Sequence, residues 1–324
     1  MNWTDKQVFV TGANGFVGGH LVEHLCGLGC RVKAFVSSDL PGPDNAFEGL
    51  PAEWSARITT VSGDIRDRGC VGRAMAGSEV VIHLAALASV PMSLDSPETY
   101  VATNVSGTLN ILEEARRQGV ERVLTTSTSE VYAIPATLPI AESHPQQART
   151  PYAATKIAAD RIAESYYRSF GLPVTVVRPF NVFGPRQSTR AVIPSLITQL
   201  LSGKDEILMG TPHPTRDMNF VVDTVAAYVK IAESEATHGL ALNVATGVEN
   251  TIGSIAERLI AMIRPSAKLI IDPSRWRGGP NPHDRIRGSS QLLKDLTGWA
   301  PAHTFDQGLA DTVEWFSRQA RQSK

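Results

Sequence analysis

The sequence is poor in cysteine, in net charge and in long hydrophobic runs, and each shortage excludes a class of protein. Its 324 residues include three cysteines, Cys26, Cys30 and Cys70, with no CxxC pair. They cannot form a disulfide framework and do not indicate a zinc or redox site, so we expect a reduced protein without a metal. Lysine and arginine number 31 against 32 acidic residues, a formal net charge of −1. That balance argues against a nucleic-acid partner, although it leaves room for a small anionic ligand.

Membrane and export signals are also missing. The most apolar later stretch, Val80 to Met92, is too short and too interrupted to span a bilayer. Residues 1–7 are polar and lead straight into Val8-Phe9-Val10, without the basic region and long apolar stretch of a signal peptide. We therefore expect a cytoplasmic protein that has no membrane partner.

What is present is a regular alternation of strand and helix signals. Hydrophobic residues make up 42% of the chain, which is ordinary for a packed globular protein. In the first 180 residues, short β-branched runs alternate with helix-length stretches, as in right-handed βαβ units with a parallel sheet. The expected strands cover residues 8–11, 31–36, 58–61, 80–84, 122–127 and 174–178; the expected helices cover 15–28, 96–118 and 152–170. The predicted fold class is α/β, a Rossmann-type doubly wound parallel sheet.

A glycine-rich turn, Gly12-Ala-Asn-Gly15-Phe-Val-Gly18, directly follows the first expected strand and opens the first helix. Such a turn lets the backbone approach a pyrophosphate, whose charge then lies at the helix N-terminus. Glycines also end strands and pack helices closely, but this position at the start of a βαβ unit favours dinucleotide binding. The three-residue spacing resembles the short-chain dehydrogenase form of the motif.

The pattern changes after Pro179, where segments shorten and proline and glycine become more frequent. We predict a domain boundary there, with residues 1–180 as the dinucleotide-binding Rossmann domain and residues 181–324 as a smaller α/β C-terminal domain. Part of the second domain, near residues 219–245, is expected to return to the large sheet. The proline- and glycine-rich segment 272–283 is predicted to form a loop over a site.

The second expected strand ends in Val36-Ser37-Ser38-Asp39. It has no acid at the strand end to hold the adenosine ribose of NAD, and no arginine there to bind the 2′-phosphate of NADP. We expect NAD and leave NADP open. Asp64 and Ile65 follow the third strand and are placed to meet the adenine; alternatively, Asp64 caps the next helix.

Tyr152 and Lys156 are spaced i and i+4 on an expected helix, so both side chains project from one face. A lysine ammonium beside a positive nicotinamide lowers the pKa of the phenol, which can then take a proton from a substrate hydroxyl. Thr128, at the end of the fifth strand, would hydrogen-bond the same substrate oxygen. The YxxxK spacing alone is common by chance, but with the glycine turn upstream it predicts a catalytic group.

Glu130 adds a carboxylate two residues past Thr128. A site that only transfers hydride needs no such group. We therefore interpret Glu130 as the base for a carbon-bound proton that a neighbouring transient ketone makes acidic. The alternative is a solvated loop glutamate.

These motifs together resemble an extended short-chain dehydrogenase/reductase that acts on nucleotide sugars. Further matching stretches are His83-Leu-Ala-Ala86, Thr103-Asn104-Val105, Arg178-Pro-Phe-Asn181-Val-Phe-Gly184-Pro-Arg186, Thr215 to Asp223 and Leu296 to Pro301, in order along nearly the whole chain. Within the family, the Thr-Ser-Glu triplet at Thr128 and the segments Ala191 to Pro194 and Pro214 to Thr224 most resemble 4,6-dehydratases of the legionaminic-acid type. UDP-glucuronate decarboxylases share the triplet.

The resemblance implies which residues meet the ligands. The catalytic residues would be Thr128, Ser129, Glu130, Tyr152 and Lys156. Cofactor contacts would come from Gly12, Gly15, Phe16, Val17, Gly18, Ser37, Asp64, Ile65, Leu84, Ala85, Ala86, Asn104, Tyr152, Lys156 and Pro179. Substrate contacts would come from Ser89, Asn181, Arg186, Val192, Arg216 and Arg285.

Arg216 and Arg285 would bind the diphosphate, because a guanidinium pairs with phosphate through two parallel hydrogen bonds. The alternative is a solvated arginine, above all for Arg285. His83 is expected to be structural. Two positions depart from the family pattern: Ser129 stands where many 4,6-dehydratases carry the aspartic acid that expels the C6 hydroxyl, and Ala133 stands where glycine is common.

The resemblance implies an NAD(P)-dependent nucleotide-sugar 4,6-dehydratase, a lyase that makes a 4-keto-6-deoxy sugar nucleotide from a UDP- or GDP-linked substrate. The second domain would hold that substrate. The alternatives are a UDP-glucuronate decarboxylase, a nucleotide-sugar 4-epimerase and a non-catalytic nucleotide-binding protein. The family also commonly forms homodimers through two helices, expected here over residues 96–118 and 152–170.

Overall fold

The computed structural model describes residues 1–37, 47, 49–132, 137–275 and 285–322. Its centre is a seven-stranded sheet in the order β10-β6-β5-β4-β1-β2-β3, in which all neighbouring strands are parallel. The strands are β1 (Gln7–Thr11), β2 (Arg31–Ser37), β3 (Ile58–Gly63), β4 (Val80–His83), β5 (Arg122–Thr126), β6 (Val174–Pro179) and β10 (Ala241–Val244). The predicted Rossmann-type sheet is confirmed.

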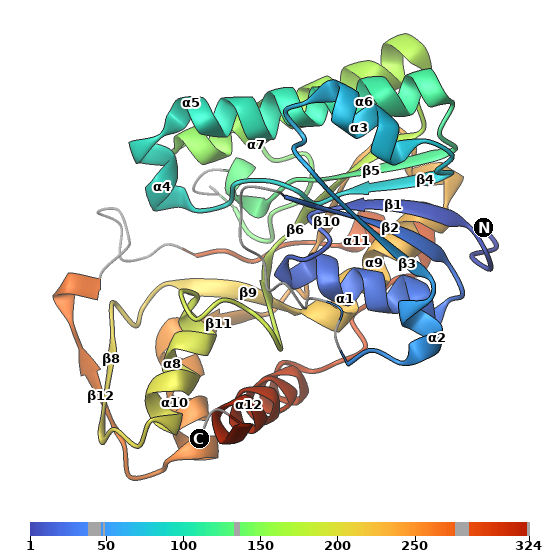
Figure 1. Ribbon diagram of the computed structural model, residues 1–324. Helices are drawn as coiled ribbons and strands as arrows, with labels where there is room; N and C mark the ends of the chain where they lie inside the picture. The colour runs from blue at the N-terminus through green and yellow to red at the C-terminus, as the bar shows by residue number, and fades with distance from the viewer. Residues whose placement is uncertain (38–46, 48, 133–136, 276–284, 323–324) are drawn as a thin grey trace.

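Helices cover both faces of this sheet, which explains why its central strands are apolar on both sides (Figure 1). One face carries α1 (Phe16–Gly27), α9 (Val221–Glu233) and α11 (Gln291–Thr297); the other carries α3 (Arg68–Met75), α6 (Gly107–Gln118) and α7 (Pro151–Phe170). The strand order reverses between β1 and β4. In such sheets the carboxyl ends of the strands at the reversal border the ligand crevice.

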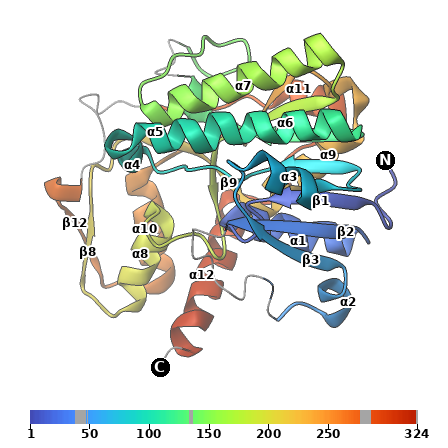
Figure 2. The ribbon, with the colours of Figure 1, turned by 45° about the horizontal axis from the view of Figure 1, so that its top comes forward.

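The helix expected over residues 96–118 is present but is not uniform. It comprises α5 (Pro97–Tyr100), a π-helical turn (Val101–Ser106) and α6. A π-turn widens the backbone by one residue and is frequent at functional sites. The run lies beside α7, as Figure 2 shows.

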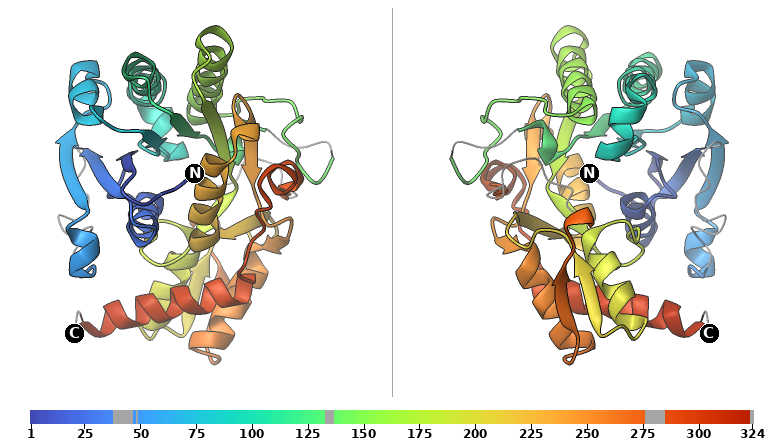
Figure 3. Two further views of the ribbon diagram at one scale, coloured as in Figure 1. Left: turned by 90° about the vertical axis from the view of Figure 1, so that its right-hand side faces the viewer. Right: turned by 90° about the vertical axis from the view of Figure 1, so that its left-hand side faces the viewer.

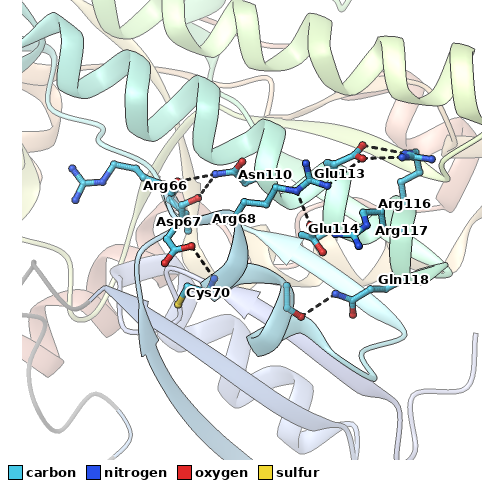
Figure 4. Close-up of polar contacts among 12 residues, drawn as sticks. Arg66, Asp67, Arg68, Cys70, Asn110, Glu113, Glu114, Arg116, Arg117 and Gln118 are labelled. Carbon is cyan, nitrogen blue, oxygen red and sulfur yellow. Dashed lines mark hydrogen bonds and ion pairs between the residues drawn. The ribbon is translucent and has the colours of Figure 1, made fainter.

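Polar contacts tie α3 and the loop before it to α6 (Figure 4). Arg68 Nε donates to Glu114 at 2.7 Å, and Gln118 Nε2 donates to the Gly72 carbonyl at 2.9 Å. Asn110 Nδ2 donates to the Ile65 carbonyl at 2.9 Å. The segment after β3, where the sequence predicts adenine contacts, is therefore held by α6.

The later part of the chain adds two small sheets and a separate apolar cluster. One sheet joins β7 (Asn181–Phe183), β9 (Thr215–Phe220) and β11 (Glu249–Thr251); the other joins β8 (Glu206–Met209) and β12 (Lys268–Ile271). Helices α8 (Val192–Leu201), α10 (Ile252–Ile263) and α12 (Phe305–Gln322) pack around them, with α12 along the lower edge in Figure 3. Residues 221–244 leave this part, because α9 and β10 belong to the large sheet's layers.

Two short helices complete the regular structure, α2 (Ala52–Ser55) and α4 (Val90–Asp95). Over the described ranges, no helix combines the length and the apolar character needed to traverse a bilayer.

Candidate active site

The glycine-rich turn between β1 and α1 leaves no room for side chains. Gly12 has a φ of +66°, and a Cβ there would lie 2.9 Å from the backbone nitrogen of Ala85. A Cβ on Gly18 would lie 2.1 Å from the carbonyl oxygen of Gly12. Helix α1 begins after Gly15, and among the described residues no side chain caps its first amides and no acid occupies its first turn. Bare backbone at the positive end of a helix fits the pyrophosphate of a dinucleotide.

His83, the last residue of β4, is a structural group as expected. Its Nδ1 lies 2.7 Å from the Thr11 hydroxyl, and its Nε2 lies 3.1 Å from the Thr108 hydroxyl. Burial lowers the pKa of His83 to about 3, so the ring is neutral. The Thr11 hydroxyl also accepts a hydrogen bond from the Ala85 nitrogen at 3.1 Å. These bonds fix the stretch 84–86 close to the glycine turn.

Asn104 lies in the π-helical turn and is fully buried. Its Oδ1 accepts from the Leu87 nitrogen at 2.8 Å, while its Nδ2 donates to the Leu87 carbonyl at 3.0 Å and to the Thr155 hydroxyl at 3.1 Å. The side chain thus joins the loop after β4 to α7. The sequence predicts a cofactor contact here, and the geometry makes Asn104 a residue that positions the loop.

Asp64 does not cap the helix that follows it, so that alternative is wrong. Its carboxylate accepts from the Arg66 backbone nitrogen at 2.8 Å and from Arg66 Nε at 2.7 Å. The α3 cap is Asp67, whose side chain accepts from the Cys70 nitrogen at 3.0 Å. The hydrogen bond from Arg66 holds the pKa of Asp64 below its usual value.

The other predicted adenine-side contacts flank the ends of β2 and β3. Ile65 is buried, whereas Ser37, the last residue of β2, is half-buried. Phe16 and Val17 are also half-buried and form the first turn of α1. Ser38 and Asp39, on which the choice between NAD and NADP depends, lie outside the described residues.

Tyr152 and Lys156 occupy the buried face of α7, as the i and i+4 spacing predicts. The helix starts at Thr150, whose hydroxyl accepts from the Ala153 nitrogen at 3.1 Å. This cap places Tyr152 in the first turn, opposite the carboxyl end of β5. The Thr128 hydroxyl, just past β5, hydrogen-bonds the Tyr152 phenol. The structure therefore brings the three predicted residues together.

Tyr152 and Lys156 are both buried, and burial shifts their pKa values in opposite directions. Burial raises the pKa of Tyr152 to about 12, although the hydrogen bond from Thr128 lowers it. Burial lowers the pKa of Lys156 to about 8. The phenol is therefore neutral at physiological pH in the unliganded chain, and an added positive charge nearby would favour its ionised form.

Ser129 and Glu130 lie in a single 3₁₀ turn, Ser129–Val131, next to Tyr152. The Glu130 nitrogen donates to the Thr128 hydroxyl at 3.2 Å, while Ser129 is buried and Glu130 is exposed. Glu130 shares this turn with Thr128 as its N-terminal neighbour, and the negative charge of Glu130 raises the pKa of Tyr152.

Tyr100 is a site residue that the sequence reasoning missed. Its ring lies edge-on to that of Tyr152, with centroids 6.4 Å apart, and its hydroxyl donates to the Ser89 carbonyl at 2.6 Å. Ser89, a predicted substrate contact, is therefore tied to the same place. The available signal was a large aromatic residue in the first turns of a helix expected to face the site.

Arg186 points to the dinucleotide-binding half of the molecule. Its two terminal nitrogens bond the two carboxylate oxygens of Glu23 on α1, the longer contact being 2.8 Å. Gly19, also on α1, lies beside the guanidinium. A substrate contact of Arg186 stays a prediction, and the present partner is a carboxylate.

Arg216 and Arg285 both lie beside β11. Arg216 is on β9, next to β11, and its Nη1 donates to the Thr215 carbonyl at 2.7 Å. Arg285 Nε donates to Glu249 on β11 at 2.9 Å. Arg285 is exposed, in agreement with the solvated alternative, and it is ion-paired with Glu249. Their contact with a diphosphate stays a prediction.

The remaining predicted contacts lie at the end of β6 or in the elements that follow it. Pro179 ends β6, Asn181 begins β7 and Val192 begins α8. Because parallel strands end at the same edge, Pro179 shares the edge of the sheet with Thr11, His83 and Thr126. Ala133 lies outside the described residues. Across the described chain, no three His, Cys, Asp or Glu side chains gather as metal ligands.

Known proteins resemble this chain over almost its whole length. The family model described as GDP-mannose 4,6 dehydratase matches residues 9–312. A dTDP-glucose 4,6-dehydratase of Mycolicibacterium smegmatis is 34% identical over 96% of this chain and 93% of its own. A UDP-glucose 4-epimerase of the same organism is 32% identical over 97% of this chain and 100% of its own.

A solved structure shares the fold of this chain over almost all of its length. The dTDP-glucose 4,6-dehydratase DesIV of Streptomyces venezuelae, crystallised with NAD bound, superposes with a TM-score of 0.84. It is 28% identical in sequence, and the match covers 98% of each chain.

Proposed function

This chain belongs to the extended short-chain dehydrogenase/reductase family of sugar-nucleotide dehydratases and epimerases, and on that basis we propose that it is an NAD-dependent nucleotide-sugar 4,6-dehydratase. The observation that carries the proposal is the position of Glu130 in the short turn capped by Thr128, where its charge acts on the Tyr152 phenol. An enzyme that only oxidises and reduces C4 has no use for a second base there. A dehydratase needs one for the proton on C5.

Tyr152 starts the reaction by taking the proton of the sugar's 4-hydroxyl. NAD, when bound, supplies the acceptor for the hydride that leaves C4 and later returns it to C6. Lys156 holds a positive charge near the phenol and so favours its ionised form. Thr128, already bonded to the phenol, orients the same oxygen. These residues make the 4-ketone.

Glu130 acts on that ketone. The ketone makes the C5 proton acidic, Glu130 removes it, and the C6 hydroxyl takes a proton from solvent and leaves as water to give a C5–C6 double bond. Ser129, buried beside Glu130, orients the C6 oxygen or a water. Once C6 has received the hydride, Glu130 would return its proton to C5, which completes the 4-keto-6-deoxy sugar.

The substrate is proposed to lie between the large sheet and the part formed by residues 181–324. Arg216 and Arg285 would meet its diphosphate, because both lie beside β11 and guanidinium groups pair well with phosphate. Ser89, Asn181, Arg186 and Val192 would meet the sugar or the nucleoside.

The second candidate is a nucleotide-sugar 4-epimerase. It is favoured by the 32% identity to a UDP-glucose 4-epimerase over that protein's full length. An epimerase shares the first oxidation but returns hydride to C4, and Glu130 would have no role.

Product mass separates these activities. The protein is incubated with NAD and, in turn, with dTDP-glucose and with UDP- and GDP-linked hexoses, N-acetylhexosamines and glucuronate. Loss of one water supports the dehydratase. Loss of carbon dioxide identifies a decarboxylase, and an unchanged mass with a new C4 configuration by NMR identifies an epimerase. Either of those results contradicts the proposal.

A further inference from the structure

A buried ion pair lies one helical turn beyond Lys156. Asp160 follows Tyr152 and Lys156 on the same face of α7, at i+8 and i+4 respectively, and is 5% exposed. Its Oδ2 accepts from Arg178 Nε at 3.0 Å and lies 2.9 Å from Arg178 Nη2. Gln146 Nε2 adds a hydrogen bond at 3.2 Å. Burying two charges is costly unless both are well bonded, so such a pair calls for an explanation.

Arg178 connects this pair to the segment that carries the catalytic base. It is near the carboxyl end of β6 and is 4% exposed. Its Nη1 donates to the Tyr132 hydroxyl at 2.7 Å, and the guanidinium lies 5.1 Å from the centre of the Tyr132 ring. The Tyr132 hydroxyl in turn donates to Asn243 Oδ1 on β10 at 2.8 Å. Residues 128–132, α7, β6 and β10 therefore meet at one ion pair.

The charged and titratable groups around Lys156 and Tyr152 come from several elements. Asp160 is the carboxylate whose charge acts on Lys156, and His83 on β4 is neutral. Tyr152 also interacts with Glu130 in the 128–132 segment, Tyr100 on α5 and Tyr228 on α9. The groups that face Asp160 and Arg178 are Tyr132 and, beside Tyr132, Glu142. The Asp160–Arg178 pair is thus the buried ion pair that lies one helical turn after Lys156 on the same face of α7.

We propose that Asp160 and Arg178 are positioning residues that set the charge balance beside Lys156 and Tyr152, and thereby the pH range in which the site works. Neither residue touches the substrate. Asp160 supplies negative charge on the catalytic face of α7, and Arg178 limits how much of that charge the dyad feels.

The direction of each effect follows from charge. The Asp160 carboxylate raises the pKa of Lys156 and also that of Tyr152. Replacing Asp160 with Asn therefore lowers both pKa values, and the uncompensated Arg178 cation acts in the same direction. Replacing Arg178 with Gln leaves the carboxylate uncompensated and raises both pKa values. Removing both charges restores the balance.

The direct test is the titration of Lys156 by NMR in the unliganded full-length chain with ¹³C-labelled lysine. The Lys156 Cε resonance is assigned by its loss in Lys156→Arg. The wild type is expected to titrate near the Lys156 pKa of about 8. Asp160→Asn should lower the midpoint by about one pH unit, and Arg178→Gln should raise it by a similar amount. The double variant should return close to the wild type.

Two further variants guard against a general loss of structure. Asp160→Glu keeps the charge and should keep the midpoint. Glu164→Gln removes the same charge one turn further along α7, from a residue paired with Arg161 and Arg168 at the surface, and should change nothing. If Asp160→Asn does not fold, Arg178→Gln compared with the double variant still isolates the effect of the carboxylate.

Unchanged midpoints in both folded single variants would overturn the proposal, as would shifts of the same sign in both. Once a substrate is known from the product-mass experiment, the pH profile of kcat should move with the midpoints. This second arm alone rests on the proposed function. A wild type that turns over no nucleotide sugar would therefore count against that function, while the NMR arm still decides the role of the pair.

Discussion

At the scale of single residues, burial and neighbouring charges set the protonation of the Tyr152 phenol and the Lys156 amine. Burial is the largest cause that moves the pKa of Tyr152 to about 12 and that of Lys156 to about 8. The bound nicotinamide, which is positive, must bring the phenol back. Glu130 opposes this, since its charge raises the pKa of Tyr152. The charge of Glu130 therefore opposes the proposed first step, and its proposed role in the second step would have to offset this.

Replacement of Glu130 by Gln tests that balance. Dehydration should fall by about 10²–10⁴-fold, because a general base is lost. Oxidation of C4 should survive and extend to lower pH, since the pKa of Tyr152 falls when the neighbouring charge is removed. The measurement is product formation together with reduced cofactor seen by absorbance at several pH values. Glu98→Gln, a similar change on exposed α5, is the control. Full dehydration by Glu130→Gln would contradict the assigned role.

The glycine turn gives a second prediction, based on space rather than charge. Gly18→Ala places a Cβ against the Gly12 carbonyl and should destabilise the protein by about 1–3 kcal/mol, with loss of NAD affinity. Gly19→Ala, on the next residue of α1, meets nothing nearer than 3.6 Å and should be tolerated. Thermal unfolding and calorimetric titration with NAD compare the two. Equal behaviour of the two variants would show that the close approach is unimportant.

At the scale of elements, periodicity located most strands and helices but not their details. The strands of the large sheet were predictable because β-branched runs have to be apolar on both faces. The π-helical turn at Val101–Ser106 was not, since its hydrophobic pattern differs from that of an α-helix by one residue only. Asp64 and Asp67 are equally good caps by composition, and the choice between them depends on where the chain turns.

Some site residues are predictable from local sequence and others are not. Local spacing predicts Tyr152, Lys156 and Thr128, and the structure brings them together. Asp160 has the same periodic signal, two turns after Tyr152, but its importance appears only with its partner Arg178 on another element. Partners distant in sequence, such as Glu23 for Arg186, leave no local trace.

The pair of Arg186 and Glu23 links the loop after β7 to α1. Glu23→Gln should cost at most about 1 kcal/mol of stability, because both side chains are partly exposed. If Arg186 also meets the substrate, Arg186→Gln should raise KM several-fold, whereas Glu23→Gln should leave KM unchanged or lower it. Steady-state kinetics and thermal unfolding of both variants decide. Equal KM values in both variants and the wild type would limit Arg186 to the structural contact.

At the scale of the whole molecule, the outer faces of the helical run 97–118 and of α7 carry exposed apolar side chains. Val101, Leu109, Tyr167 and Phe170 belong to this group. The homodimer that the sequence resemblance implies would cover these helices. Exposed apolar side chains on these two neighbouring helices are what such an interface would cover.

Leu109→Arg should therefore raise the dissociation constant of the dimer by roughly ten-fold or more. Sedimentation velocity should then show a monomer where the wild type is a dimer. Val248→Arg, another exposed apolar position, lies in the turn before β11 and should leave the assembly intact. A wild type that is already monomeric at high concentration would contradict the dimer outright.

β10 comes late in the sequence, and this has a consequence for folding while the chain is being synthesised. β6 pairs with β5 on one side, but its other edge stays bare until residues 241–244 exist to cover it. The apolar face that α9 covers is equally open until then. An unpaired edge and an uncovered face are what nascent chains aggregate through. The sheet formed by residues 1–180 is therefore complete only after β10, a strand synthesised well after Tyr152, has left the ribosome.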